Sequence, residues 1–384
     1  MFPIYLDYNA TTPVRPEVLE EMLPFFKDGF GNPSSSHAYG SSPKQVIMLA
    51  RERLSALLGC HPDETVFTGC GSESDNMALK GIADTLRHRG NHIITTSIEH
   101  PAVILTCKYL ERKGFEVTYL PVDEFGRVSP NDVEGAITER TILITVMHAN
   151  NETGSVQPIG EIGRIARDKG IYCHTDAAQS VGKIPVNVDD LGVSLLTVAG
   201  HKFQAPKGIG ALYIRRGIRI EPLIHGGGQE HGLRAGTENV ALIAGLGKAA
   251  ELAAQELDSN RQRLTALRDK LQAALESAPE RVKLNGHPTE RLPNTLNLSF
   301  EGIDSTELLA AMPEVAASTG SACHADRREP SAVLTAMGVP RKLALGAVRL
   351  SVGRYTTEEE IDRASEIIAG QVFELRGKAG KKPL

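Results

Sequence analysis

The sequence predicts an α/β fold in which helices cover both faces of a mostly parallel β-sheet. Between residues 65 and 176, short β-type runs alternate with amphipathic helical patterns, which is typical of parallel strands joined by crossover helices. The run Thr141–Met147 is apolar apart from its two threonines, as expected of a strand buried on both faces. Polar residues follow several of these runs directly, and ligands bind at that edge of such sheets.

Composition narrows the class of protein. The 384 residues suffice for two domains. The net charge of −5 does not indicate a surface that binds polyanions, so no direct nucleic-acid binding is expected. No apolar run approaches the length of a membrane span, and the N-terminus is too short and acidic for a secretion signal. The five cysteines lack a CxxC pair and the twelve histidines lack ligand spacing, so we expect a cytoplasmic protein with reduced thiols and no metal site.

Each element of the first 214 residues follows from a local period. Residues 5–12 read as an extended arm, and a helical pattern begins at Pro13. Strands are expected at 65–68, 92–96, 115–120, 141–147, 170–172, 194–199 and 210–214. Helices are expected at 42–58, 74–86, 100–109, 131–136 and 159–166.

The remaining chain predicts a smaller unit after a long helix. Residues 238–278 are helical in pattern, and this length predicts a break or kink. Strands are then expected at 282–284, 295–299, 315–317 and 348–352, and helices at 306–311 and 357–375.

Two residues at strand ends indicate cofactor chemistry. Lys202 sits in a tight loop between the strands at 194–199 and 210–214, and Asp176 follows an apolar run. An acid that can pair with a pyridine nitrogen, followed by a lysine that can bind an aldehyde, is the protein's share of pyridoxal 5'-phosphate (PLP) chemistry. Alone, the lysine would be a solvated charge and the aspartate a helix cap. The interpretation therefore depends on the whole set.

Other loops complete that set. The segment 69–74 offers glycines and hydroxyls at a helix N-terminus, which is how a phosphate monoester is bound. His100 follows a strand and could stack on a cofactor ring, and the polar segment 148–154 follows the most apolar strand, as a pocket loop does.

These residues carry a family resemblance over nearly the whole chain. The sequence resembles the NifS/IscS-type cysteine desulfurases, which are PLP enzymes of fold type I. The segments that carry the resemblance are Leu6–Thr12, Gly31–Ser35, Gly71–Asn76, Asn150–Gly154, His174–Ser180, Gly200–Lys202, Gly226–Glu230, Arg234–Asn239 and Gly320–Cys323.

The resemblance implies a specific architecture. A large PLP-binding domain of residues 14–257 would contain a mostly parallel seven-stranded sheet. A smaller α+β domain would comprise residues 1–13 and 258–384 and carry the cysteine loop. A homodimer is implied because Thr237 would reach the phosphate of the other subunit's cofactor.

The resemblance also implies a role for each cofactor residue. Lys202 would bind PLP covalently and later move protons at the substrate Cα, and Asp176 would pair with the pyridinium nitrogen. His100 would stack on the ring and take part in proton transfer, and Gln179 would hydrogen-bond the ring hydroxyl oxygen. The phosphate would be held by Gly71, Ser72, His201 and Thr237.

On the substrate side, the resemblance implies that Arg349 would bind the carboxylate of L-cysteine and that Asn151 would assist. Asn151 would also contact the cofactor, and Asn32 would add a polar contact to the substrate. Cys323 would be the nucleophile that takes the sulfur as a persulfide and releases alanine. The sulfur would pass to an acceptor such as an iron–sulfur scaffold protein or a protein of tRNA or DNA thiolation.

Two residues depart from the desulfurase pattern. Ala199 replaces a phosphate-binding serine, and His324 follows the cysteine, as in the related selenocysteine lyases. A selenocysteine lyase acting on L-selenocysteine is therefore the alternative function. A catalytically silent PLP-binding scaffold and a conventional aminotransferase are weaker alternatives, because the first would need no intact catalytic set and the second no Cys323.

Overall fold

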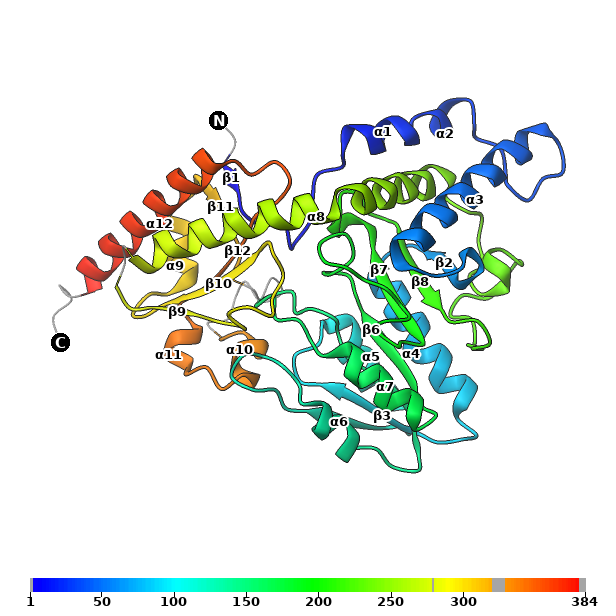
Figure 1. Ribbon diagram of the computed structural model, residues 1–384, viewed down its shortest axis with the longest axis horizontal. Coiled ribbons are helices and arrows are strands. Elements are labelled where there is room, and N and C mark those ends of the chain that lie inside the picture. Colours follow the sequence, from blue (N-terminus) through cyan, green and yellow to red (C-terminus); the bar gives the residue numbers. More distant parts are fainter. Residues whose placement is uncertain (1–2, 278–279, 320–328, 380–384) are drawn as a thin grey trace.

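The large sheet of the computed structural model confirms the predicted architecture (Figure 1). The structure describes residues 3–277, 280–319 and 329–379. The seven strands are ordered β2-β8-β7-β6-β5-β3-β4, and all neighbours pair in parallel except β8, which is antiparallel to β2 and β7. Their bounds are β2 (Thr65–Thr68), β3 (His92–Thr96), β4 (Glu116–Leu120), β5 (Thr141–Thr145), β6 (Tyr172–Asp176), β7 (Leu195–Ala199) and β8 (Gly210–Ile214).

Both faces of this sheet are buried, because successive strand residues enter different cores. Ile93 and Leu143 pack with helices α4 and α5, whereas Ile94 and Ile144 pack with α3, α7 and α8. Each such aliphatic side chain stabilises the fold by about 1.5–3 kcal/mol when fully buried. The helices of this half are α1 (Pro16–Met22), α2 (Pro24–Lys27), α3 (Ala38–Leu58), α4 (Gly71–Leu86), α5 (Pro101–Glu111), α6 (Pro130–Gly135) and α7 (Ile159–Asp168), with 3-10 turns η1 (Pro62–Glu64), η2 (Gly200–Lys202) and η3 (Glu230–Gly232).

Strand β6 continues farther than predicted. The apolar run ends at Tyr172, yet the strand continues through the polar residues to Asp176. Both ring nitrogens of buried His174 find hydroxyl partners on neighbouring strands, at 2.8 Å from Thr145 Oγ1 and 3.1 Å from Thr197 Oγ1. A polar strand can be buried there because its side chains are hydrogen-bonded.

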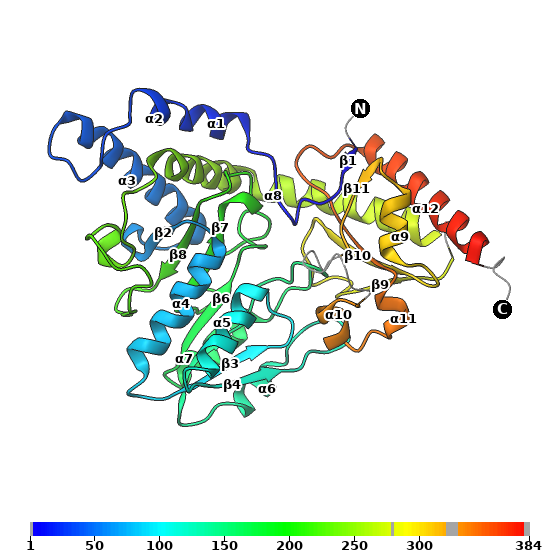
Figure 2. The ribbon, with the colours of Figure 1, turned by 180° about the vertical axis from the view of Figure 1, so that it is seen from behind.

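A second unit lies beside the large sheet, and both ends of the described chain belong to it (Figure 2). Its antiparallel sheet is ordered β12-β10-β9, and β1 pairs in parallel with β11. Its elements are β1 (Ile4–Tyr5), β9 (Val282–Leu284), β10 (Thr295–Phe300), α9 (Ser305–Ala311), β11 (Val315–Ala316), α10 (Ala332–Ala336), α11 (Arg341–Ala344), β12 (Ala347–Ser351) and α12 (Glu358–Ala379). The short helices α10 and α11 were not predicted.

Helix α8 (Val240–Ser277) connects the two units, and the predicted break in it is wrong. It is one helix of 38 residues that crosses from one unit to the other (Figure 1). Leu246 near its start packs into the core of the large sheet, whereas Leu271 near its end packs into the core of the small unit. Because two separate cores hold its ends, the helix can stay continuous through residues 251–263, where no side chain is buried. The proposed domain boundary between residues 257 and 258 lies in that stretch.

Candidate active site

Three predicted site residues meet at the carboxyl edge of the large sheet. Asp176 is the last residue of β6, Lys202 ends the turn after β7, and His100 precedes α5 shortly after β3. One carboxylate oxygen of Asp176, one of the buried Asp75 and one ring nitrogen of His100 lie within 4.8 Å of one another. The parallel strands thus deliver an amine, a carboxylate and an imidazole to one place.

The amine of Lys202 is held by the N-terminal arm, residues 5–12. Its Nζ donates to the carbonyl oxygens of Asn9 at 2.6 Å and Ala10 at 3.0 Å. Burial lowers the pKa of Lys202 to about 8, and the nearby Arg349 guanidinium lowers it as well. Much of this amine is therefore neutral in mildly alkaline solution, as a nucleophilic amine requires.

Asp176 shares its buried site with a second carboxyl group. Burial raises the pKa of Asp176, whereas the Ala178 N–H at 2.9 Å and the Lys202 ammonium lower it. Burial and the adjacent Asp176 charge raise the pKa of Asp75 well above its usual range. Of the two carboxyl groups, Asp75 therefore holds a proton more readily than Asp176.

His100 faces this site as the cap of α5. Its Nδ1 accepts a hydrogen bond from the Ala102 N–H at 3.2 Å. Desolvation lowers the pKa of His100, so the ring is neutral at pH 7 and its other nitrogen carries the proton.

The N-terminus of α4 forms the anion-binding side of the site. Its first N–H groups have no partner inside the helix, and the helix dipole favours a negative charge there. A Cβ on Gly71 would lie 3.1 Å from the Ala199 Cβ, which is a tight contact, so glycine favours this close approach of the helix end to β7. Ser72 is exposed here and lines, with His100, a surface groove between α4 and α5. The helix end, its glycine and its hydroxyl fit a phosphate monoester.

Ion pairs fix the loops around that helix end. Glu73 accepts from the Gly69 N–H at 2.8 Å and from Arg234 Nε at 2.9 Å. Buried Glu230 pairs with Arg51 at 2.6 Å. The loop before α4 is therefore tied to the segment 226–239, which carries Thr237.

The remaining predicted contacts differ in their surroundings. His201 Nδ1 lies 3.1 Å from Thr11 Oγ1, and burial together with nearby lysines lowers the pKa of His201 to about 4. Asn32 and Thr237 are exposed, and Asn32 Oδ1 accepts from the Ser34 N–H at 2.9 Å. The folded chain thus places His201 within the site, whereas Asn32 and Thr237 lie on the surface of the single chain.

Arg349, the predicted carboxylate clamp, is buried and firmly oriented. One terminal nitrogen donates to Asp7 Oδ1 at 2.7 Å and the other to the Asn151 carbonyl oxygen at 3.1 Å. The Nε of Arg349 is buried without a hydrogen-bond partner, and the Asn151 side-chain amide has none within the described ranges. Donors for a substrate carboxylate therefore remain.

Sequence reasoning missed Asn9, which is 1% exposed and connects the parts of the site. Its carbonyl accepts from Gln179 Nε2 at 3.0 Å as well as from Lys202. The other polar atoms of Asn9 bond to Ser351 Oγ at 2.9 Å, Thr295 Oγ1 at 2.8 Å, Asn294 Nδ2 at 2.9 Å and Lys183 Nζ at 3.2 Å. The only signal for Asn9 in the sequence was its place in the segment Leu6–Thr12.

Cys323 and His324 lie outside the described residues. The described chain before them is tied to the site, because Ser318 exchanges backbone hydrogen bonds of 3.2 and 2.7 Å with Arg349. The chain after them is tied as well, because Ser331 Oγ donates to the buried Glu152 carboxylate at 2.5 Å.

Comparisons with known proteins agree with this geometry. The Aminotransferase class-V family matches residues 4–364. The chain is 51% identical to a protein named cysteine desulfurase IscS from Methanosarcina thermophila over 99% of this chain and 94% of the relative, and 51% identical to a protein of the same name from Dictyoglomus turgidum over 97% and 95%.

Solved structures give the same result. A NifS-like protein with 41% identity superposes with a TM-score of 0.91 over 97% of this chain and all of the other. A structure described as SspA in complex with cysteine shows 41% identity and a TM-score of 0.83 over 92% and 99%. The chain therefore belongs to the class-V aminotransferase family, among the NifS/IscS-type cysteine desulfurases.

Proposed function

We propose that the chain is a PLP-dependent cysteine desulfurase that converts L-cysteine to L-alanine and keeps the sulfur as a persulfide on Cys323. The observation that carries this proposal is that one edge of the sheet holds the Lys202 amine, whose lowered pKa of about 8 suits a nucleophile, near the Asp176 carboxyl group at the end of β6. The names of the relatives and the cysteine-bound neighbour support the substrate.

The described residues fit PLP in number and in kind. When bound, PLP supplies a ring that stabilises negative charge on the substrate carbon. Lys202 would hold it covalently through Nζ, and Asp176 would keep the pyridine nitrogen protonated. Neutral His100 would stack on the ring, and Gln179 would donate to its oxygen.

The phosphate contacts imply two subunits. Gly71 and Ser72 at the start of α4 would bind the phosphate with His201. The exposed Thr237 would reach the phosphate of a second copy, so we include a homodimer in the proposal.

On the substrate side, Arg349 and Asn151 would bind the carboxylate of L-cysteine, and Asn32 would contribute a polar contact. The Cys323 thiolate would form a bond to the substrate sulfur while the substrate C–S bond breaks. The electron pair of that bond stays with carbon, which takes up protons and leaves as alanine.

The later fate of the sulfur is a separate part of the proposal. The persulfide would pass to an acceptor protein of iron–sulfur cluster assembly or of nucleic-acid thiolation, within the cytoplasm. None of the helices in the described part of the chain has both the length and the apolarity that a bilayer crossing requires.

The test compares the wild type with Cys323→Ala and with Cys60→Ala, after reconstitution with PLP. Burial raises the pKa of the Cys60 thiol to about 12, so Cys60→Ala is the matched control. We expect wild type and control to form equal alanine and sulfide from L-cysteine with a thiol reductant, and Cys323→Ala to form less than about 1% as much. Full activity of Cys323→Ala on L-cysteine would refute the persulfide assignment, and activity on L-selenocysteine alone would favour the lyase.

A further inference from the structure

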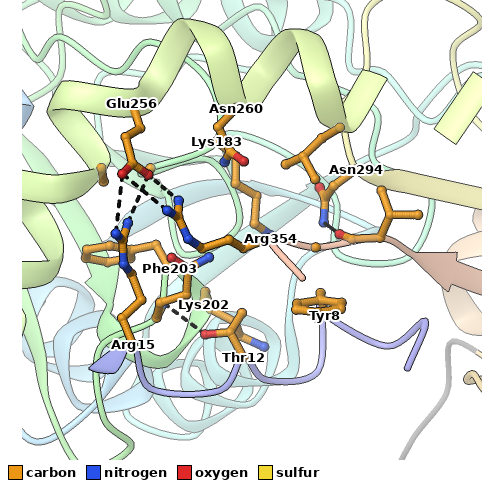
Figure 3. A pocket seen from close by; sticks show the side chains of 16 residues that line it. Tyr8, Thr12, Arg15, Lys183, Lys202, Phe203, Glu256, Asn260, Asn294 and Arg354 are labelled. Carbon is orange, nitrogen blue, oxygen red and sulfur yellow. Dashed lines mark hydrogen bonds and ion pairs between the residues drawn. The ribbon is translucent and has the colours of Figure 1, made fainter. Parts of the chain in front are cut away.

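Lys183 is a buried amine that the proposed reaction does not use. It is 6% exposed and lines a cavity of about 30 Å³ together with Lys202 and Asn294 (Figure 3). Its Nζ donates to Gln179 Oε1 at 2.8 Å and to Asn9 Oδ1 at 3.2 Å, and no carboxylate of the described chain pairs with it. An amine buried among neutral partners is costly, which suggests that its position matters.

The two partners of the Gln179 amide settle which way it points. The Asn9 backbone carbonyl can only accept, so the amide oxygen faces Lys183, whose Nζ donates to it, and the amide nitrogen faces that carbonyl. On that side, Gln179 Nε2 donates to the Asn9 carbonyl at 3.0 Å. The same carbonyl accepts from Lys202 at 2.6 Å, so one oxygen aligns the amide with the reactive amine.

We propose that Lys183 is a positioning residue, which holds the Gln179 amide with its N–H groups toward Lys202 and the cofactor ring. This inference rests on the proposed function. An N–H donor stabilises an oxygen anion on the ring, whereas a flipped amide would present its carbonyl oxygen and repel that anion. Asn9 supports the arrangement because it accepts from all three side chains.

Several other charged groups surround these amines. Lys202 is faced by Arg349 of β12, Asp176 of β6 and Asp7 of the N-terminal arm. Burial lowers the pKa of the nearby His100 and His201 imidazoles, and the charge of Lys202 lowers both further. Burial lowers the pKa of Lys183 well below its usual value, and the nearby Lys202 and Arg349 charges lower it further.

The test titrates the visible absorption band of the PLP-loaded enzyme with pH. In Lys183→Met the ring oxygen loses its oriented donor, so the deprotonated form is less stable and we expect the midpoint to rise by about one pH unit. Lys207→Met removes an exposed lysine and should leave the midpoint within about 0.2 unit. Lys183→Gln keeps an N–H donor at this position and should reverse most of the shift. A wild-type midpoint in folded Lys183→Met overturns the proposal.

A second measurement covers the case in which Lys183→Met does not fold. In the wild-type holoenzyme with ¹⁵N-labelled glutamine, the Gln179 side-chain amide should exchange its protons at least about tenfold more slowly than free glutamine. Exchange at the free rate contradicts a fixed amide. A wild type that gains no visible band with PLP refutes the proposed function itself, whereas a normal band with an unshifted Lys183→Met midpoint refutes only the role of Lys183.

Discussion

The carboxyl edge of the large sheet and the N-terminal arm both build the site, but in different ways. At the sheet edge, Asp176, Lys202 and His100 each lie within a few residues of a strand, so the local chain places them. The arm contains no catalytic group of its own, yet its Asn9 carbonyl holds Lys202 and its Asp7 holds Arg349. The sheet edge supplies reactive groups, whereas the arm supplies their orientation through long-range hydrogen bonds.

Replacing a residue at the sheet edge should have the largest effect. In Lys202→Ala, the proposed covalent link and proton transfer are both lost, so we expect turnover of L-cysteine to fall by about 10⁴-fold. Alanine release measured with saturating PLP tests this, and the exposed Lys207→Ala is the control. A loss of less than tenfold in turnover would contradict the proposed catalytic role of Lys202.

Replacing the hub of the arm should mainly affect stability. Asn9→Ala removes one hydrogen bond each from the buried side chains of Thr295, Asn294 and Lys183, and we expect the free energy of unfolding to fall by about 3 kcal/mol. Denaturant unfolding of this variant is to be compared with Asn131→Ala, an exposed position that should cost less than about 0.5 kcal/mol. Equal losses in the two variants would show that the arm does not hold the site together.

The pH dependence of cofactor binding reports on both regions. Only the neutral Lys202 amine attacks an aldehyde, and its neutral fraction rises with pH until the pKa of about 8 is passed. The rate of PLP binding to the cofactor-free protein should therefore rise about 50-fold from pH 6 to pH 8 and less than about twofold from pH 8 to pH 9. A flat profile over this range would contradict the lowered pKa.

The effect of the arm residue Asp7 on the pKa of Lys202 should be the smallest of these effects. The Asp7 carboxylate raises the pKa of Lys202, and it also pairs with the Arg349 guanidinium, which lowers it. Asp7→Asn should therefore move the midpoint of the binding profile down by about half a pH unit. An upward shift would show that Asp7 acts on the amine in another way.

Most of the fold could be predicted from local sequence periods. Strand β5 has the apolar sequence of a buried strand, and helix α4 has apolar residues at helical spacing. Both elements form where these patterns predict them. Two predictions failed for tertiary reasons. Strand β6 includes polar residues because neighbouring strands satisfy His174, and α8 is unbroken because two cores hold its ends.

The sequence by itself determined the reactive set, because Asp176, Lys202 and His100 follow strands whose ends must meet at one edge of a parallel sheet. Only the tertiary structure decided which groups orient that set. Asn9 is bonded to Thr295, 286 positions away, and to Lys183, 174 positions away. Such partners leave no local period or spacing, because their hydrogen bonds join segments that only the packed cores bring together.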